Sequence, residues 1–111
     1  MDTTEEKILL KLNGRQKKYL KGLGHHLSPV ILIGKEGMSP RLIEATTLEL
    51  QNHELIKIKI GNNSNVAKQD AALTLTEATG GELVQLIGKT LLLYRENPEK
   101  PQDERIKVPK N

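Results

Sequence analysis

The stretch VILIGKEGMSPRL, residues 30–42, decides the fold of this 111-residue chain. It begins as an apolar run over 30–33, pauses at the glycines of 34–37 and resumes at Ser39. Apolar residues bounded by turn signals predict a buried strand. Serine is a favoured N-cap, and the proline that follows it suits the first position of a helix, where its missing N–H costs nothing. The stretch therefore predicts a strand, a glycine turn and a helix.

Further elements follow from periodicity on either side of this stretch. Gln16, Leu20, Leu23 and Leu27 lie at helical spacing and predict the buried side of a helix that ends near Gly24 or at residue 27. Alternation over 55–60 predicts a strand. The expected elements are helices over 14–27, 39–53 and 66–79 and strands over 30–33, 55–60, 82–87 and 90–95. Their order predicts an α/β fold of the α+β sandwich type, with a single four-stranded mixed sheet and helices on at least one face.

The length of the chain fits one domain. We expect a flexible N-terminal arm over 1–11, a folded domain over 12–95 and a C-terminal tail over 96–111 whose end Ile106 and Val108 could pin to the body. Within the second helix, we expect Leu42, Ile43, Thr46, Leu50 and His53 to face inward, and within the third Ala71, Ala72, Leu75 and Ala78, with Asn65 as its cap.

Charge is segregated along the chain. Between residues 11 and 35 there is no carboxylate, and the cations are Lys11, Arg15, Lys17, Lys18, Lys21 and Lys35, with His25 and His26 among them. This distribution is typical of a surface that binds a polyanion, although a solvated helix face would look the same. On the 55–60 strand, Lys57 and Lys59 would extend the patch if their face of the sheet is open.

The glycine pause offers a second anion-binding feature. Gly34 and Gly37 would let the backbone take positive φ and approach a ligand closely, Lys35 would neutralise a phosphate, and the helix that follows starts with free N–H groups. Glu36 opposes this interpretation by its charge. A plain turn between strand and helix is the alternative.

Other classes of function find little support. The chain has no cysteine, its paired histidines point apart on a helix, and no nucleotide-binding or nucleophile motif is present, so we expect neither a metal, a cofactor nor an enzyme. With two tyrosines and no Phe or Trp, stacking of splayed bases is disfavoured, and binding should go mainly to phosphates and 2′-hydroxyls of structured RNA. No signal peptide or apolar span is evident, so we expect a cytoplasmic protein away from membranes.

Five blocks, in order, resemble the bacterial YhbY-type CRM (chloroplast RNA splicing and ribosome maturation) domain. They are NGRQKKYLKGLGHHL (13–27), PVILIGKEGMS (29–39), HELIKIKI (53–60), VQLIGKTLLLYR (84–95) and RIKVPK (105–110). The resemblance implies an RNA-binding fold similar to the C-terminal domain of translation initiation factor three, acting on precursors of the large ribosomal subunit. It assigns the family's G-x-x-G loop to 34–37 and its basic helix to Arg15, Lys17, Lys18 and Lys21.

The expected function is thus binding of structured RNA, in particular ribosomal RNA of the pre-50S particle, by a monomer. The expected site comprises the loop, the basic helix, His25, Lys57 and Lys59, with the helix cations beside the loop so that both form one seat for the RNA backbone. Two rivals remain open: a protein-interaction module that docks on ribosomal proteins without touching RNA, and a small nucleotide-using enzyme.

Overall fold

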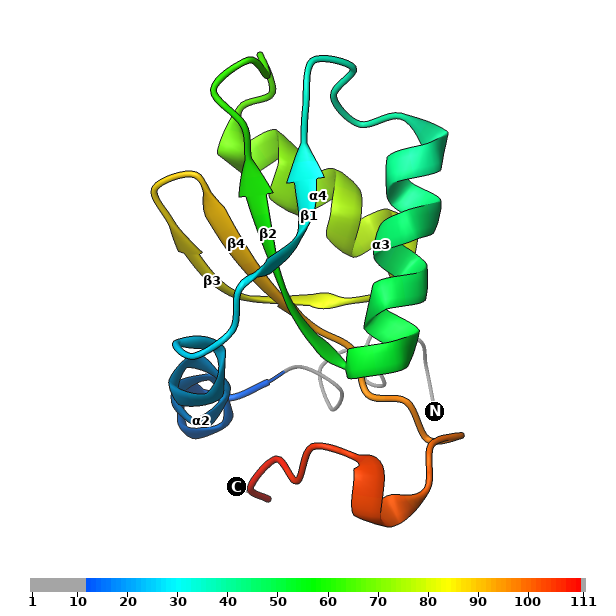
Figure 1. The fold of residues 1–111 in the computed structure, drawn as a ribbon. Coiled ribbons are helices and arrows are strands. Elements are labelled where there is room, and N and C mark those ends of the chain that lie inside the picture. The colour runs from blue at the N-terminus through cyan, green and yellow to red at the C-terminus, as the bar shows by residue number, and fades with distance from the viewer. Residues whose placement is uncertain (1–11, 111) are drawn as a thin grey trace, which may run out of the picture.

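The computed structural model describes residues 12–110, which fold around one mixed sheet (Figure 1). The elements are α2 (Gly14–Gly24), β1 (Pro29–Ile33), α3 (Pro40–His53), β2 (Leu55–Ile60), α4 (Lys68–Thr79), β3 (Glu82–Ile87), β4 (Thr90–Tyr94) and the 3-10 turn η1 (Gln102–Glu104). Within this described part, three α-helices and a four-stranded sheet follow each other in the predicted order, which confirms the fold class. The arm expected over 1–11 lies outside the described residues.

The strands lie in the order β1-β2-β4-β3. β1 runs parallel to β2, whereas β4 is antiparallel to both β2 and β3. The chain crosses from β1 to β2 through α3, as a parallel connection requires, and β3 turns directly into β4 at Gly88, whose φ of 55° suits a tight hairpin. β1 and β3 are therefore the two edges of the sheet.

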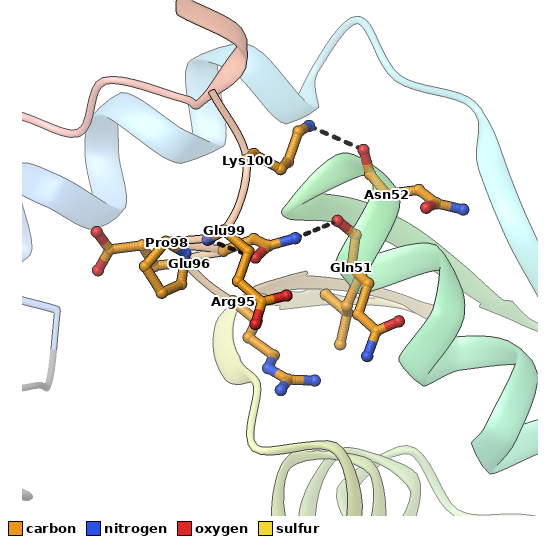
Figure 2. Close-up of a pocket in the computed structure, with 9 residues that line it drawn as sticks. Gln51, Asn52, Arg95, Glu96, Pro98, Glu99 and Lys100 are labelled. Atoms are coloured by element: carbon orange, nitrogen blue, oxygen red, sulfur yellow. Dashed lines mark hydrogen bonds between the residues drawn. The ribbon is translucent and has the colours of Figure 1, made fainter. Parts of the chain in front are cut away.

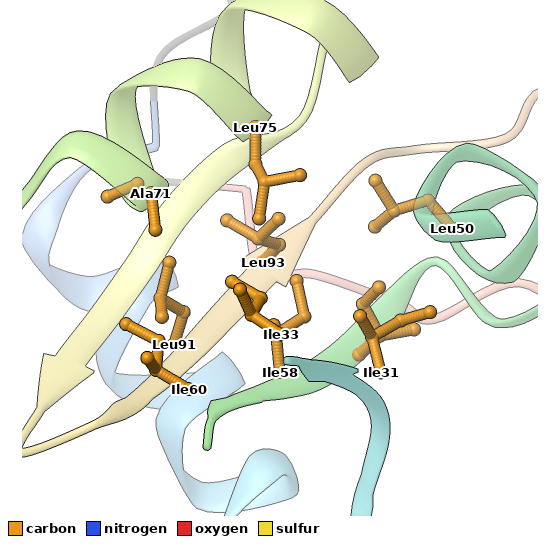
Figure 3. Close-up of a cluster of buried hydrophobic side chains, with 11 residues drawn as sticks. Ile31, Ile33, Leu50, Ile58, Ile60, Ala71, Leu75, Leu91 and Leu93 are labelled. Atoms are coloured by element: carbon orange, nitrogen blue, oxygen red, sulfur yellow. The ribbon is translucent and has the colours of Figure 1, made fainter. Parts of the chain in front are cut away.

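One face of the sheet is covered by α3 and α4. The predicted alternation is confirmed here, because Ile56, Ile58 and Ile60 of β2 all point into this core. Figure 3 shows the aliphatic side chains that fill it from both helices and from the strands. The buried members of this first core are Ile31, Ile33, Leu50, Ile56, Ile58, Ile60, Ala71, Ala72, Leu75, Leu91 and Leu93.

The opposite face carries α2 and the C-terminal tail over a smaller second core, which consists of Leu20, Leu55, Val84, Leu92 and Tyr94. The prediction that Leu23 and Leu27 face inward is wrong, because both are 38% exposed. The reason is Gly24, where an added Cβ would lie 2.6 Å from Leu92 Cδ2. The missing side chain lets the helix approach the sheet there, so its buried line runs through Leu20 and Gly24.

Helix boundaries follow local hydrogen bonds. At the start of α2, Asn13 and Gln16 form a reciprocal capping box, and Ser39 caps α3 by accepting from the Leu42 N–H at 3.2 Å. The expected cap of α4 at Asn65 is wrong, since the helix starts after Ala67 without a side-chain cap. Residues 61–66 form a turn instead, so α4 begins at Lys68, two residues after the predicted start.

Two side chains predicted to face inward are exposed. His53, the last residue of α3, lies beyond the core because the chain reverses at Glu54, and its Nε2 instead lies 3.3 Å from Glu49 Oε2. Ala78 is exposed while its neighbour Thr79 is buried, with the Thr79 hydroxyl donating to the Leu75 carbonyl at 2.6 Å. The threonine methyl can thus face the core once its hydroxyl is satisfied.

Glu54 organises the tail. It is fully buried, has a φ of 64°, and its carboxylate accepts from the backbone N–H groups of Asn97 at 2.8 Å and Ile106 at 2.7 Å. Ile106 and Val108 pack against the second core, as the sequence suggested. One buried carboxylate therefore holds two points of the tail and places its end beneath α2.

Candidate functional site

The glycine loop leads from β1 to α3 and is closed by a hydrogen bond from the Gly37 N–H to the Gly34 carbonyl at 3.1 Å. Only Gly37 has positive φ (67°), and a Cβ added there would lie 3.1 Å from a methyl of Val66. The prediction of positive φ at Gly34 is wrong. Apart from Gly34 itself and its two chain neighbours, no described residue has an atom within 4 Å of the position that a Cβ of Gly34 would take, so its backbone is open to a ligand from outside.

Lys35 and Glu36 are both exposed between the two glycines. The loop lies beside the 61–64 turn, because the Gly61 N–H donates to the Ile33 carbonyl at 2.8 Å. That turn in turn meets the hairpin, where Lys89 Nζ donates to Asn62 Oδ1 at 3.3 Å. The glycine loop, the turn and the hairpin therefore gather at one end of the sheet, which we call the loop end (Figure 1).

Sequence reasoning missed two cations at the loop end. Arg41 is exposed in the first turn of α3, four residues after Gly37, and Lys89 is exposed in the hairpin turn. The position of Arg41 just past the N-cap was a signal in the sequence. Lys89 is far from the loop in sequence, and only the pairing of the strands brings it near.

The basic helix lies elsewhere. Arg15, Lys18, Lys21 and His25 are exposed and Lys17 is half-buried. Figure 1 shows α2 at the start of β1 and the glycine loop at its end. A five-residue strand spans roughly 17 Å. The expectation that the helix cations and the loop form one compact seat is therefore wrong, because β1 carries the chain away from α2 before the loop begins.

Two lysines of β2 connect these separate groups. Lys57 is paired with Pro29 and Leu92, and Lys59 with Leu32 and Thr90, so both side chains point to the face that carries α2. Lys57 is half-buried and Lys59 is exposed. Alternate residues on one strand are about 7 Å apart. Lys57 and Lys59 thus lie between α2 and the glycine loop on this face of the sheet.

The sheet face around Lys59 is open. Across the four strands, the row formed by Leu32, Lys59, Thr90 and Ile87 runs from one edge to the other. Leu32 is 61% exposed and Ile87 62% exposed. α2 covers only the neighbouring part of this face, over Leu92. We call the surface from α2 through Lys57 and Lys59 to the loop end the cationic path.

The described cations of this path have no carboxylate partner. Within residues 12–110, no lysine or arginine nitrogen lies within 4 Å of a carboxylate oxygen. The one contact of this kind made by a histidine there, between His53 and Glu49, is at the far end of α3. Unpaired positive charges keep their full attraction for an external polyanion.

Two hollows of similar size lie on the surface of the described residues. The first, of about 550 Å³, lies between the end of α3 and residues 95–100 (Figure 2). Its polar groups already hold the tail: Asn97 Nδ2 donates to the Gln51 carbonyl and Lys100 Nζ to the Asn52 carbonyl, both at 2.9 Å. The second, of about 530 Å³, lies between α2 and the sheet, on the cationic path. The first is a tail contact, and the second belongs to the candidate site.

Other site chemistries find no support within the described residues. No group of three or more His, Cys, Asp or Glu side chains there could hold a metal ion, and no helix there is long and apolar enough to cross a membrane. Burial raises the pKa of Tyr94 to about 12, with Glu54 and Glu96 adding to the shift. Tyr94 lies in the second core, away from the path.

The fold and the path define a small α/β domain with one closed and one cationic face. Residues 12–95 match the family model of the CRS1 / YhbY (CRM) domain, and the chain belongs to this family, as the resemblance in the sequence predicted.

This chain is similar to two bacterial proteins over most of their length. A Bacillus subtilis protein named "Probable RNA-binding protein YqeI" is 38% identical over 93 residues, which is 84% of this chain and 97% of the relative. A Haemophilus influenzae protein named "RNA-binding protein" is 38% identical over 88 residues, covering 79% of this chain and 89% of the relative. The solution structure of SAV1595 from Staphylococcus aureus superposes with a TM-score of 0.72 at 40% identity, covering 89% of this chain and all of that chain.

Proposed function

We propose that this protein binds structured RNA by its sugar-phosphate backbone and that its target is the ribosomal RNA of precursors of the large subunit. The observation that carries the proposal is the cationic path, a set of lysines and arginines without carboxylate partners among the described residues. Membership of the CRM family and the names of its relatives support the same class of ligand.

The geometry favours binding of several consecutive phosphates of an RNA backbone over binding of a single anion. α2 and the loop end lie at opposite ends of β1, so one phosphate cannot touch both, whereas a backbone strand laid along β2 meets Lys57, Lys59 and then Lys35. At the loop, the open backbone of Gly34 admits the sugar-phosphate chain closely. Glu36 points into solvent at the same place and sets a limit on the affinity of the loop.

Salt dependence tests the phosphate mechanism. If about four phosphates are neutralised, the logarithm of the binding constant falls with the logarithm of salt at a slope of roughly −3 to −4. Affinity for a hairpin RNA, measured by fluorescence anisotropy, should then fall about a hundredfold between 50 and 200 mM salt. A flat salt profile would contradict the proposal.

The ribosomal target needs a separate experiment in cells. Ultraviolet crosslinking of the protein followed by sequencing of the attached RNA should return fragments of the large-subunit ribosomal RNA and its precursor. Fragments spread over messenger RNA in proportion to abundance would contradict the assignment of the target but not RNA binding itself.

One observation favours a second candidate, a module that docks on a ribosomal protein. Leu32 and Ile87 are large apolar side chains that lie exposed on the open row of the sheet, where a protein partner could cover them. Binding to intact large-subunit precursors without any binding to naked RNA would favour this candidate over the first.

A further inference from the structure

The second hollow, between α2 and the sheet, is shaped unlike a surface for phosphates alone. It is lined by residues of α2, β2, β3 and β4 and by His25 just past the helix, namely Lys21, Gly22, Gly24, His25, Lys57, Gln85, Ile87, Thr90 and Leu92. Its volume of about 530 Å³ lies in the range of small-molecule sites. The close approach of Gly24 to Leu92 sets α2 against the sheet and forms the inner wall.

The polar side chains that line the hollow make no hydrogen bonds within the described residues. Among residues 12–110, the side chains of Lys21, His25, Lys57, Gln85 and Thr90 make no hydrogen bond to any protein group, and no acidic residue lines the hollow. Lys21 and His25 are exposed and Lys57, Gln85 and Thr90 are half-buried, so all five side chains are accessible to a ligand that enters the hollow.

The lining divides by chemistry. The exposed Ile87 presents aliphatic surface, whereas Leu92 is only 2% exposed and lies beneath α2; Gln85 presents an amide that donates and accepts, and Lys21 and Lys57 supply positive charge. A ligand that matches all three has a flat, largely apolar body, a hydrogen-bonding edge and an anionic group. We propose that the hollow binds one unpaired nucleotide of the RNA, with its base against Ile87 and its phosphate between Lys21 and Lys57.

The amide also indicates which base fits. Glutamine pairs with adenine through two hydrogen bonds, and a base extruded from a helix can lie on apolar side chains while its edge is read by hydrogen bonds. Adenine is therefore the preferred base. The inference rests on the proposed RNA binding, and it adds an unpaired nucleotide to a surface that otherwise contacts only backbone.

A pair of RNA hairpins tests the inference, one with a single bulged adenosine and one identical but fully paired. Wild-type protein should bind the bulged hairpin about tenfold more tightly in an anisotropy titration. Gln85→Met keeps the length of a half-buried side chain that has no hydrogen bond to lose, and it should abolish the preference while leaving affinity for the paired hairpin unchanged. Gln69→Met, on exposed α4 surface, is the matched control and should keep the preference.

A second measurement locates the contact. In amide NMR spectra, the signals of Gln85 and Thr90 should shift with the bulged hairpin and stay in place with the paired one. Equal wild-type affinity for the two hairpins, or a preference that survives Gln85→Met, would overturn the inference and leave backbone binding intact. Absence of binding to either hairpin would instead refute the proposed function.

Discussion

The two faces of the sheet differ in how completely they are closed. The face under α3 and α4 is filled by eleven buried side chains, all of them aliphatic. The face under α2 has a core of five, completed by the tail, and beyond it a row of side chains stays uncovered. Stability and binding are thus separated: the closed face holds the fold together, while the half-open face leaves lysines and an amide without partners.

This separation follows from one alternating strand. In β2, Ile56, Ile58 and Ile60 enter the closed face, so Lys57 and Lys59 must enter the other. A helix of eleven residues cannot cover the whole of that second face. The same six residues therefore build the core and expose the charge.

The largest expected effect is loss of stability from the closed face. Leu93→Ala removes a fully buried side chain of β4 and should lower the free energy of unfolding by about 3 to 4 kcal/mol. The exposed Leu73→Ala on α4 is the control and should change it by less than about 0.5 kcal/mol. Urea denaturation measures both, and a cost below about 1 kcal/mol for Leu93→Ala would show that the closed face does not carry the stability.

The next effect concerns the tail that completes the half-open face. Glu54→Gln leaves one half-buried backbone N–H, of Asn97 or Ile106, without its carboxylate acceptor and should cost about 2 kcal/mol. Hydrogen exchange should rise at both amides. Glu99→Gln, exposed in the same tail, should leave stability and exchange unchanged. Unaltered exchange at both Asn97 and Ile106 in Glu54→Gln would refute the role of the carboxylate as the anchor of the tail.

Smaller effects are expected from alanine substitutions at the two glycines of the glycine loop, one of which should affect stability and the other RNA binding. Gly37→Ala places a side chain at a φ of 67° and against Val66, so it should cost about 1 to 2 kcal/mol of stability. Gly34→Ala meets no described atom and should leave stability within about 0.5 kcal/mol. It should nevertheless weaken RNA binding on the order of tenfold, about 1.4 kcal/mol. Equal RNA affinity of Gly34→Ala and wild type would exclude close backbone contact at this glycine.

Sequence alone predicted what short-range rules control. The alternation of 55–60, the Ser39 cap and the Gly88 turn each depend on neighbours within a few residues, and the structure has all three. The family could be recognised from five blocks because their order and spacing are specific.

What sequence could not predict depends on long-range packing. The buried side of α2 runs through Gly24 and not through the predicted Leu23, because Gly24 packs against Leu92, 68 positions away in the sequence. The sequence led us to expect that the basic helix and the glycine loop form a single binding surface, because nothing in it shows that α2 and the loop lie at opposite ends of β1. Lys89 lies at the loop end only because the strands pair, which local sequence does not reveal. Glu54 accepts hydrogen bonds only because the tail folds back to it.

The measurement that most directly tests the central claim is the salt slope of RNA binding in two single-lysine variants. Lys59→Gln removes a charge from the middle of the cationic path, whereas Lys100→Gln removes one from the tail contact beside α3. If the half-open face carries the RNA backbone, the slope should become shallower by about 0.9 in Lys59→Gln and stay at the wild-type value in Lys100→Gln. An unchanged slope in Lys59→Gln, or an equal change in both variants, would contradict the claim.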